Sequence, residues 1–232
     1  MDEANPTTKR FCFLSESFAL DEQFLDTAGL RGTRSHPIER YRANTRKVVG
    51  QIVMNPNPVE LANLLPWILG TDAAGNTFAL AETTQPLTVQ IARDNGTDGK
   101  LFTYPVCHIN KATFKCSQGG PLQLTLDMVG TDETVGNAGA FPATSLDLTT
   151  NAYIWSDCAL VVNAVTYNAK EIEIVIDNML DQDRFFNSQT LTAIVAKDRA
   201  ITVNTLLGYG DAEAAYNTGI GGVAVTATVT NG

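Results

Sequence analysis

The segment from Ile154 to Gly208 constrains the fold of this chain more than any other part. It contains a succession of short stretches in which apolar and β-branched residues alternate with polar ones, separated by polar turns. This period of two is typical of half-buried strands in an antiparallel sheet. No set of residues in the segment has the spacing of a catalytic motif. The pattern therefore predicts a β-rich protein that acts through the surface it presents and not through a catalytic site.

Similar strand patterns occur elsewhere in the chain. Within the segment, strands are expected at 158–162, 165–167, 171–176, 191–196 and 200–207, and outside it at 87–93, 101–106, 109–116, 122–129 and 223–230. Two of these strands have one apolar face and one wettable face, as expected for a sheet that covers a core on one side. The wettable faces carry Gln123, Thr125, Asp127, Glu171 and Glu173.

One helix is expected at about 57–69. Asn57 is a suitable N-cap, Pro58 occupies the first helical position, and Glu60 stands at the third, where it can complete a capping box. Gly70 is a typical C-terminal stop. Apolar residues recur at helical spacing between these ends, so one face should pack on a sheet. Pro66 is expected to kink or divide the helix, because proline has no N–H to donate.

Residues 31–47 differ from the rest of the chain in charge. They carry one acidic residue, Glu39, and six basic residues in a chain whose formal net charge is −9: Arg31, Arg34, Arg40, Arg42, Arg46 and Lys47. We expect a basic arm or hairpin at about 31–54, preceded by an irregular connection at 21–36, and Gly50 indicates a bulge or a close backbone approach. Such an asymmetry suits self-assembly through opposite charges. It suits nucleic-acid binding less well, because few aromatic residues are interleaved and the acidic remainder repels phosphate.

Length and composition favour one domain over residues 1–232, with a long loop at about 130–150. The longest apolar runs are too short to cross a bilayer, and no secretory signal is visible, so a cytoplasmic origin is expected. The four cysteines form no CxxC pair and are expected to be reduced, packed thiols.

Candidate chemistry is sparse. His36 and His108 have no ligand-like spacing, so no metal and no cofactor is expected. The acidic residues Asp177, Asp181 and Asp183 could hold a cation or act as a carboxylate pair, but their sequence context is typical of a turn after a strand. The sequence therefore predicts a protein that is not an enzyme.

Three segments together resemble the major tail tube proteins of long-tailed, siphovirus-like bacteriophages. They are GQIVMNPNPVELANLLPWILG (50–70), HINKATFKCSQGGPLQLTLDMVGTDE (108–133) and WSDCALVVNAVTYNAKEIEIVIDNMLDQDRFFNSQTLTAIVAKDRAITV (155–203). The resemblance lies in the order of elements, and no single motif is diagnostic.

The resemblance implies an antiparallel β-sandwich or partly closed barrel with one flanking helix. It also implies hexameric rings that stack into a hollow tube in the virion tail, with DNA only as passing cargo. The other expected partners are the tape-measure, tail terminator and baseplate or tail-tip proteins, with no membrane partner. Under this reading the basic residues of 31–47 become candidates for contacts between subunits. The five residues of the wettable faces become candidates for the lining of the lumen.

Three alternatives remain at this point. A carbohydrate-binding β-sandwich would favour an exposed aromatic platform, whereas Trp67 and Trp155 lie in an apolar helix and beside a strand. A capsid decoration or tail-completion protein would have similar strand periodicity. A hydrolase that uses Asp181 or Asp183 would need further acid, base or nucleophile residues.

Overall fold

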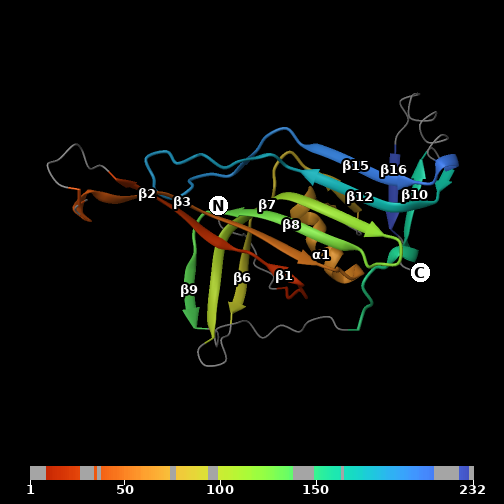
Figure 1. Ribbon diagram of the computed structural model, residues 1–232, viewed down its shortest axis with the longest axis horizontal. Helices are drawn as coiled ribbons and strands as arrows, with labels where there is room; N and C mark the ends of the chain where they lie inside the picture. Colours follow the sequence, from red (N-terminus) through yellow and green to blue (C-terminus); the bar gives the residue numbers. More distant parts are fainter. Residues whose placement is uncertain are drawn as a thin grey trace.

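Antiparallel strands dominate the fold, which confirms the prediction of a mainly β protein (Figure 1). The computed structural model describes residues 9–26, 34–35, 38–73, 77–93, 99–137, 149–162, 165–211 and 225–229. The largest sheet has nine strands: β1 (Ser15–Glu16), β2 (Ala19–Asp26), β3 (Tyr41–Met54), β6 (Leu87–Arg93), β7 (Lys100–Ser117), β8 (Gln123–Gly130), β9 (Thr134–Asn137), β12 (Ala169–Asp177) and β15 (Ala200–Leu207).

The central path of this sheet runs β1-β3-β8-β7-β12-β15. The register sets apolar residues against one another, with Leu124 and Ile174 on either side of Phe114. On strand β8, which lies between β3 and β7, Leu124 and Leu126 are completely or almost completely buried. Gln123, on the same strand, is exposed. Because side chains alternate along a strand, the central strands β7, β8 and β12 have one mainly apolar face and one mainly polar face.

Strand β7 is bent, so that the parts of the sheet on either side of the bend enclose a sandwich-like core. Two separate strands were expected at 101–106 and 109–116, but the structure has one strand over Lys100–Ser117. Its first half pairs with β6 and β9 and its second half with β8 and β12. Val106 has a φ of 51°, so the chain turns there without leaving the ladder. The turn places buried Tyr104 and Ile109 in the same core.

The helix α1 (Pro58–Leu69) covers the apolar face of the sheet. Asn57 caps it, and the capping box with Glu60 is complete. Leu64 and Ile68 are buried in the main core. Pro66 does not divide the helix, which runs on to Gly70, whose N–H bonds to the carbonyl of Pro66. A proline at this position removes only one helical N–H donor, and packing against the sheet holds the rest.

The N-terminal part of the chain differs from expectation. The segment 21–36 was expected to be irregular, but strand β2 extends to Asp26 and pairs with β3. Nearly all of β2 is exposed on both faces, so it lacks the alternation of burial that marks a strand in sequence. Beyond β8, strands β2 and β3 continue as a two-stranded projection, visible at the left of Figure 1. We call its residues 21–26 and 41–47 the arm.

A smaller sheet of three strands lies at the opposite end of the molecule from the arm (Figure 1). It consists of β10 (Cys158–Val162), β11 (Val165–Tyr167) and β16 (Val225–Val229), in the order β11-β10-β16. Leu160, Tyr167 and Ile172 form its own buried cluster, which joins it to β12. Two pairs of short strands complete the fold: β4 (Gly70–Ala73) with β5 (Thr77–Leu80), and β13 (Leu180–Asp181) with β14 (Val195–Ala196).

Two further expectations differ in detail from the structure. A strand was expected at 191–196, but only Val195–Ala196 is extended, and it pairs with β13 outside the main sheet. The segment 130–150 was expected to be a loop, but Thr134–Asn137 forms β9 at its start. Residues 138–148 of that segment lie outside the described part of the chain.

Candidate assembly surfaces

The polar face of the large sheet brings together all five residues of the expected wettable faces. Gln123, Thr125 and Asp127 lie on β8, and Glu171 and Glu173 on β12, with β7 between the two strands. Strand register adds residues that the sequence analysis did not select: Lys111, Thr113 and Lys115 of β7, Gln51 of β3, and Asn204 of β15. The alternation of polar and apolar residues over 109–116 was the signal in the sequence that could have identified the three β7 residues.

The acidic groups of this polar face are held by neighbouring strands. Lys115 Nζ lies 3.1 Å from Glu171 Oε1, and Ser117 donates to the same carboxylate at 3.2 Å. Asn204 Nδ2 donates to Glu173 Oε2 at 2.9 Å. The hydrogen bond from Lys115, followed by that from Ser117, lowers the pKa of the Glu171 carboxyl. Exposed pairs of this kind add little stability, so their main effect is to fix the pattern of charge on the face.

A second cross-strand row has the same character. Gln51 Nε2 donates to Asp127 Oδ1 at 2.7 Å. Lys111 stands between Asp127 on one neighbouring strand and Asp177 on the other. The polar face therefore carries more acidic than basic side chains, and each described acidic residue on it has a polar or basic neighbour.

Both lateral edges of the large sheet are open among the described residues. Strand β15 pairs only with β12, and β1 and β2 pair only with β3. On β15, the exposed fractions are 49% for Ile201 and 57% for Leu206. Open edges with exposed apolar side chains are surfaces on which another strand can add.

The arm is less basic in the structure than in the sequence. Strand β2 places Asp21 opposite Lys47 and Glu22 opposite Arg46. Arg46 Nη2 also forms an ion pair with Asp132 at 3.0 Å. Two of its basic residues, Arg46 and Lys47, thus face acidic residues of the same subunit, and two of those acidic residues, Asp21 and Glu22, lie in the segment that was expected to be irregular.

The other basic candidates have different positions. Arg34, Arg40 and Arg42 are exposed, and Arg31 lies outside the described residues. Towards its tip, the arm has a stacked pair of rings, Phe24 and Tyr41, with centroids 5.3 Å apart. Both rings are about half exposed, so the arm offers an apolar contact as well as charge.

The acidic cluster after β12 has the structure of a turn. Asp177 accepts the N–H of Met179, and Asp181 pairs with Arg184 Nε at 2.9 Å. The hydrogen bond from Arg184 lowers the pKa of the Asp181 carboxyl, which is the opposite of what a general acid needs. Over the described ranges, no three histidine, cysteine or acidic residues are placed to hold a metal ion.

The remaining candidates for a small-molecule site lie in packed positions. His108 is 7% exposed and shares a hydrogen bond of 2.8 Å with the hydroxyl of Thr84. Trp67 packs against the main core and Trp155 against the smaller one. His36 lies outside the described residues.

In the described chain, α1 and the other helices are all too short or too polar to span a membrane.

Comparisons with known proteins agree with the resemblance seen in the sequence. A search of curated protein sequences finds no match. A family model described as phage tail tube protein matches residues 5–232, nearly the whole chain. This family consists of structural components of the virion tail. The chain therefore belongs to the phage tail tube protein family.

Proposed function

We propose that this protein self-assembles into hexameric rings that stack into the hollow tail tube, the conduit through which the phage genome enters the host. The observation that carries this proposal is a single sheet that, over the residues that the structure describes, has two open lateral edges and one solvated face. Such a sheet can continue from one subunit to the next while its polar face remains in contact with water.

The ring contact joins unlike surfaces. The β15 edge of one subunit meets the β1 and β2 edge of the next, so each copy uses two different edges. A contact of this heterologous kind closes into a ring when its rotation divides the circle. Addition of strands across the contact would pair the open backbone groups and cover Ile201 and Leu206.

The polar face lines the lumen. Asp127, Glu171 and Glu173 give it acidic character, and Lys111 and Lys115 are the basic residues among the selected positions. Because phosphate groups are repelled by carboxylates and retained by clustered lysines, this balance favours passage of DNA without binding. DNA is then a non-specific cargo, and no catalytic group is required.

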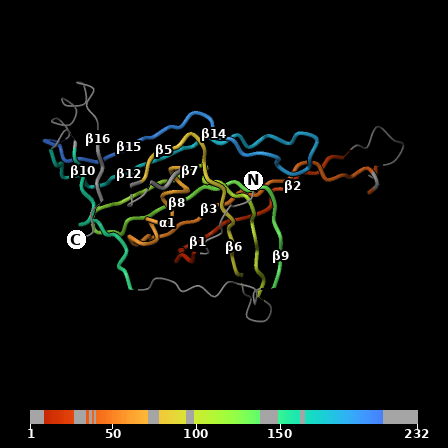
Figure 2. Tube along the Cα trace, turned by 180° about the vertical axis from the view of Figure 1, so that it is seen from behind, coloured from red at the N-terminus to blue at the C-terminus, as the bar shows by residue number. Residues whose placement is uncertain are grey.

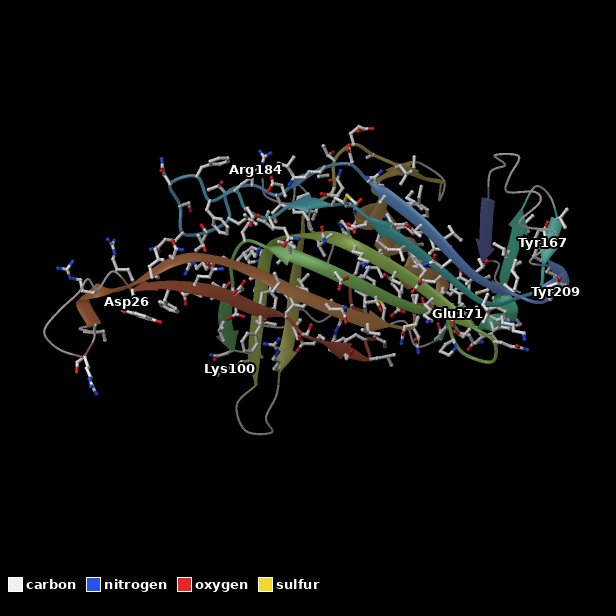
Figure 3. All side chains as sticks on the ribbon, turned by 45° about the horizontal axis from the view of Figure 1, so that its top comes forward. Asp26, Lys100, Tyr167, Glu171, Arg184 and Tyr209 are labelled. Carbon is white, nitrogen blue, oxygen red and sulfur yellow. The ribbon has the colours of Figure 1, made fainter. Side chains whose placement is uncertain are left out.

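The arm makes the contact between rings. Asp26 marks the arm at one end of the long axis in Figure 3, whereas Tyr167 and Tyr209 lie at the other end. A projection at one end and a different surface at the other suit repeated stacking, which builds an open filament. The exposed Phe24–Tyr41 stack, Arg40 and Arg42 supply apolar and charged contacts.

Assembly takes place in the host cytoplasm, where the tape-measure, tail terminator and baseplate or tail-tip proteins are the further partners. Negative-stain electron microscopy of the purified protein tests the central claim. Hollow rings or tubes are the expected result. A monodisperse monomer that persists at high concentration and binds glycans would contradict the proposal and favour a carbohydrate-binding sandwich.

A further inference from the structure

The end of the molecule opposite the arm has an open pocket at the junction of its two sheets. The pocket has a volume of about 460 Å³ and is lined by residues of β10, β11 and β12. Its apolar lining includes Trp155, Leu160 and Ile172, which form or pack against the smaller core. Tyr167 also lines the pocket and marks this end of the molecule in Figure 3. The size and the apolar lining are those of a binding site.

Polar and charged side chains surround this apolar lining. Asn168, Lys170 and Asp211 line the pocket, and Asn168 and Lys170 are exposed. Asp157 lies beside it, one residue before the lining residue Cys158. The two aspartates outnumber the one lysine, so the described surroundings of the pocket carry an excess of negative charge. An apolar centre with a polar rim is the usual arrangement of a surface that receives another protein.

The arm exposes apolar side chains on both of its faces towards the tip. Phe24 and Tyr41 stack on one face, and Leu25 lies on the other, across from Arg42. The exposed fractions are 49% for Phe24, 50% for Leu25 and 57% for Tyr41. Ile38, shortly before β3, is 81% exposed. Large apolar side chains gathered on a surface mark an interaction site, so the tip is expected to be covered by another protein surface.

We propose that the tip of the arm inserts into the pocket of a second copy of the chain in the next ring, with Phe24 and Tyr41 against Trp155. This inference rests on the proposed stacking of rings and identifies the surface that receives the arm. Asp26 on the arm and Tyr167 at the pocket lie at opposite ends of the molecule in Figure 3. Each copy therefore offers an arm at one end and a pocket at the other. A contact between unlike ends can repeat without closing, as a stack of rings requires.

The charges of the two surfaces are complementary. Near the described tip of the arm, Arg40 and Arg42 outnumber Asp26, whereas the surroundings of the pocket are acidic. Within the described part of the chain, neither Arg42 nor Asp211 forms an ion pair. Both charges are thus available for a contact between copies. Opposite charges at the rim of an interface set the orientation of the partner, while the apolar centre is buried.

A cross-linking experiment on the assembled protein tests this contact. The variant Cys12→Ser/Leu25→Cys/Asn168→Cys has one new thiol on the arm and one at the pocket, and it lacks the exposed thiol of Cys12. Its tubes are treated with a short bis-maleimide and then analysed by denaturing gel electrophoresis and peptide mapping. The expected product is a ladder of covalent multimers in which position 25 of one chain is joined to position 168, or to Cys158 in the same pocket, of another.

A pair of substitutions gives an independent measurement. Phe24→Asp puts a charge where a ring should be buried, so electron microscopy should show rings but no tubes. Leu80→Asp is the matched control on β5, outside the arm and the pocket, with 53% exposure compared with 49% for Phe24. It should form tubes as the wild type does. Circular dichroism should be the same for both variants, because each replaced side chain is exposed in the isolated subunit.

Two kinds of result would overturn the proposal, and they differ in what they say about the tube. Tubes that give no link between position 25 and the pocket, or tubes from Phe24→Asp, would show that the arm lies elsewhere. The pocket would then be left to another occupant, such as a glycan, while the proposed tube would stand. Absence of both rings and tubes from the wild-type protein would remove the proposed function and this inference together.

Discussion

The carboxylate of Glu60 accepts the backbone N–H of Cys12 at 3.1 Å, which ties the N-terminal segment to the first turn of α1. Its second oxygen accepts the N–H of Asn57 at the same distance and closes the capping box. Glu60 and Asn57 are each 4% exposed, so the N–H of Asn57 depends on this side chain and not on water. One residue thus serves as a helix cap and as the anchor of a segment distant in sequence.

Substitution Glu60→Ala should lower the free energy of unfolding by about 1–3 kcal/mol, because the buried N–H of Asn57 loses its acceptor and the partly buried N–H of Cys12 loses its bond to the helix. Urea denaturation measures the change. Glu82→Ala is the control, since Glu82 is exposed, and it should change stability by less than about 0.5 kcal/mol. Equal stability of the two variants would mean that the anchor contributes nothing.

Asn178 connects three parts of the fold from a position that is 1% exposed. Its Nδ2 donates to the carbonyls of Ile68 and Ile109, and its Oδ1 accepts from Arg199 Nε. Asn178→Asp places an oxygen opposite two carbonyl oxygens and should cost about 2–4 kcal/mol. Thermal and urea unfolding should show this loss, whereas Asn168→Asp, at an exposed position, should leave both transitions nearly unchanged.

Gly50 is required by the close approach of β3 to Phe18. A Cβ at this position would lie 2.5 Å from Phe18 Cγ and 2.8 Å from Phe18 Cα. Because the Cα cannot move aside like a side chain, Gly50→Ala should lower stability by about 1–3 kcal/mol. At Gly136 an added Cβ would lie 4.0 Å from the carbonyl oxygen of Leu101, so Gly136→Ala should be neutral or slightly stabilising. A harmless Gly50→Ala in denaturation experiments would refute the steric argument.

His108 should make stability depend on pH between about 6.5 and 4. Burial lowers its pKa from 6.5 to about 4, so in this range the unfolded chain binds a proton that the folded chain does not. Stability is therefore fully present above the unfolded pKa and falls as the pH drops, by about 1.4 kcal/mol per pH unit at most.

The comparison of wild type with His108→Gln isolates this effect, because the carboxyl groups that titrate in the same range are common to both. Free energies of unfolding at several pH values should show a steeper fall for the wild type. Parallel curves for the two proteins would show that His108 is protonated equally in the folded and unfolded states.

Ile201→Lys should block assembly without unfolding the subunit, if β15 forms the proposed ring contact. A lysine at an open edge must lose its hydration when another strand is added. Val59→Lys is a matched control on α1, away from the sheet edges, with 47% exposure compared with 49% for Ile201. Electron microscopy and sedimentation should show monomers for Ile201→Lys and tubes for Val59→Lys, with similar circular dichroism. Tubes from both variants would remove β15 from the ring contact.

Local sequence patterns predicted the regular elements well where each pattern reflects burial on one side. Strand β8 and helix α1 fall where alternation and capping residues predict them, since these signals come from the elements themselves (Figure 2). Strand β2 was missed because it is exposed on both faces and stabilised by pairing with β3. The continuity of β7 was missed because a bend at Val106 resembles a chain break in a hydrophobic pattern.

The sequence by itself determined the β-rich class, the capped helix and the polar faces of β8 and β12, because each depends on residues close together in the chain. Only the tertiary structure decided that these two faces form one surface across β7, and that β2 places acidic residues against the basic arm. Register and the meeting of distant strands depend on non-local pairing, which a local pattern does not encode.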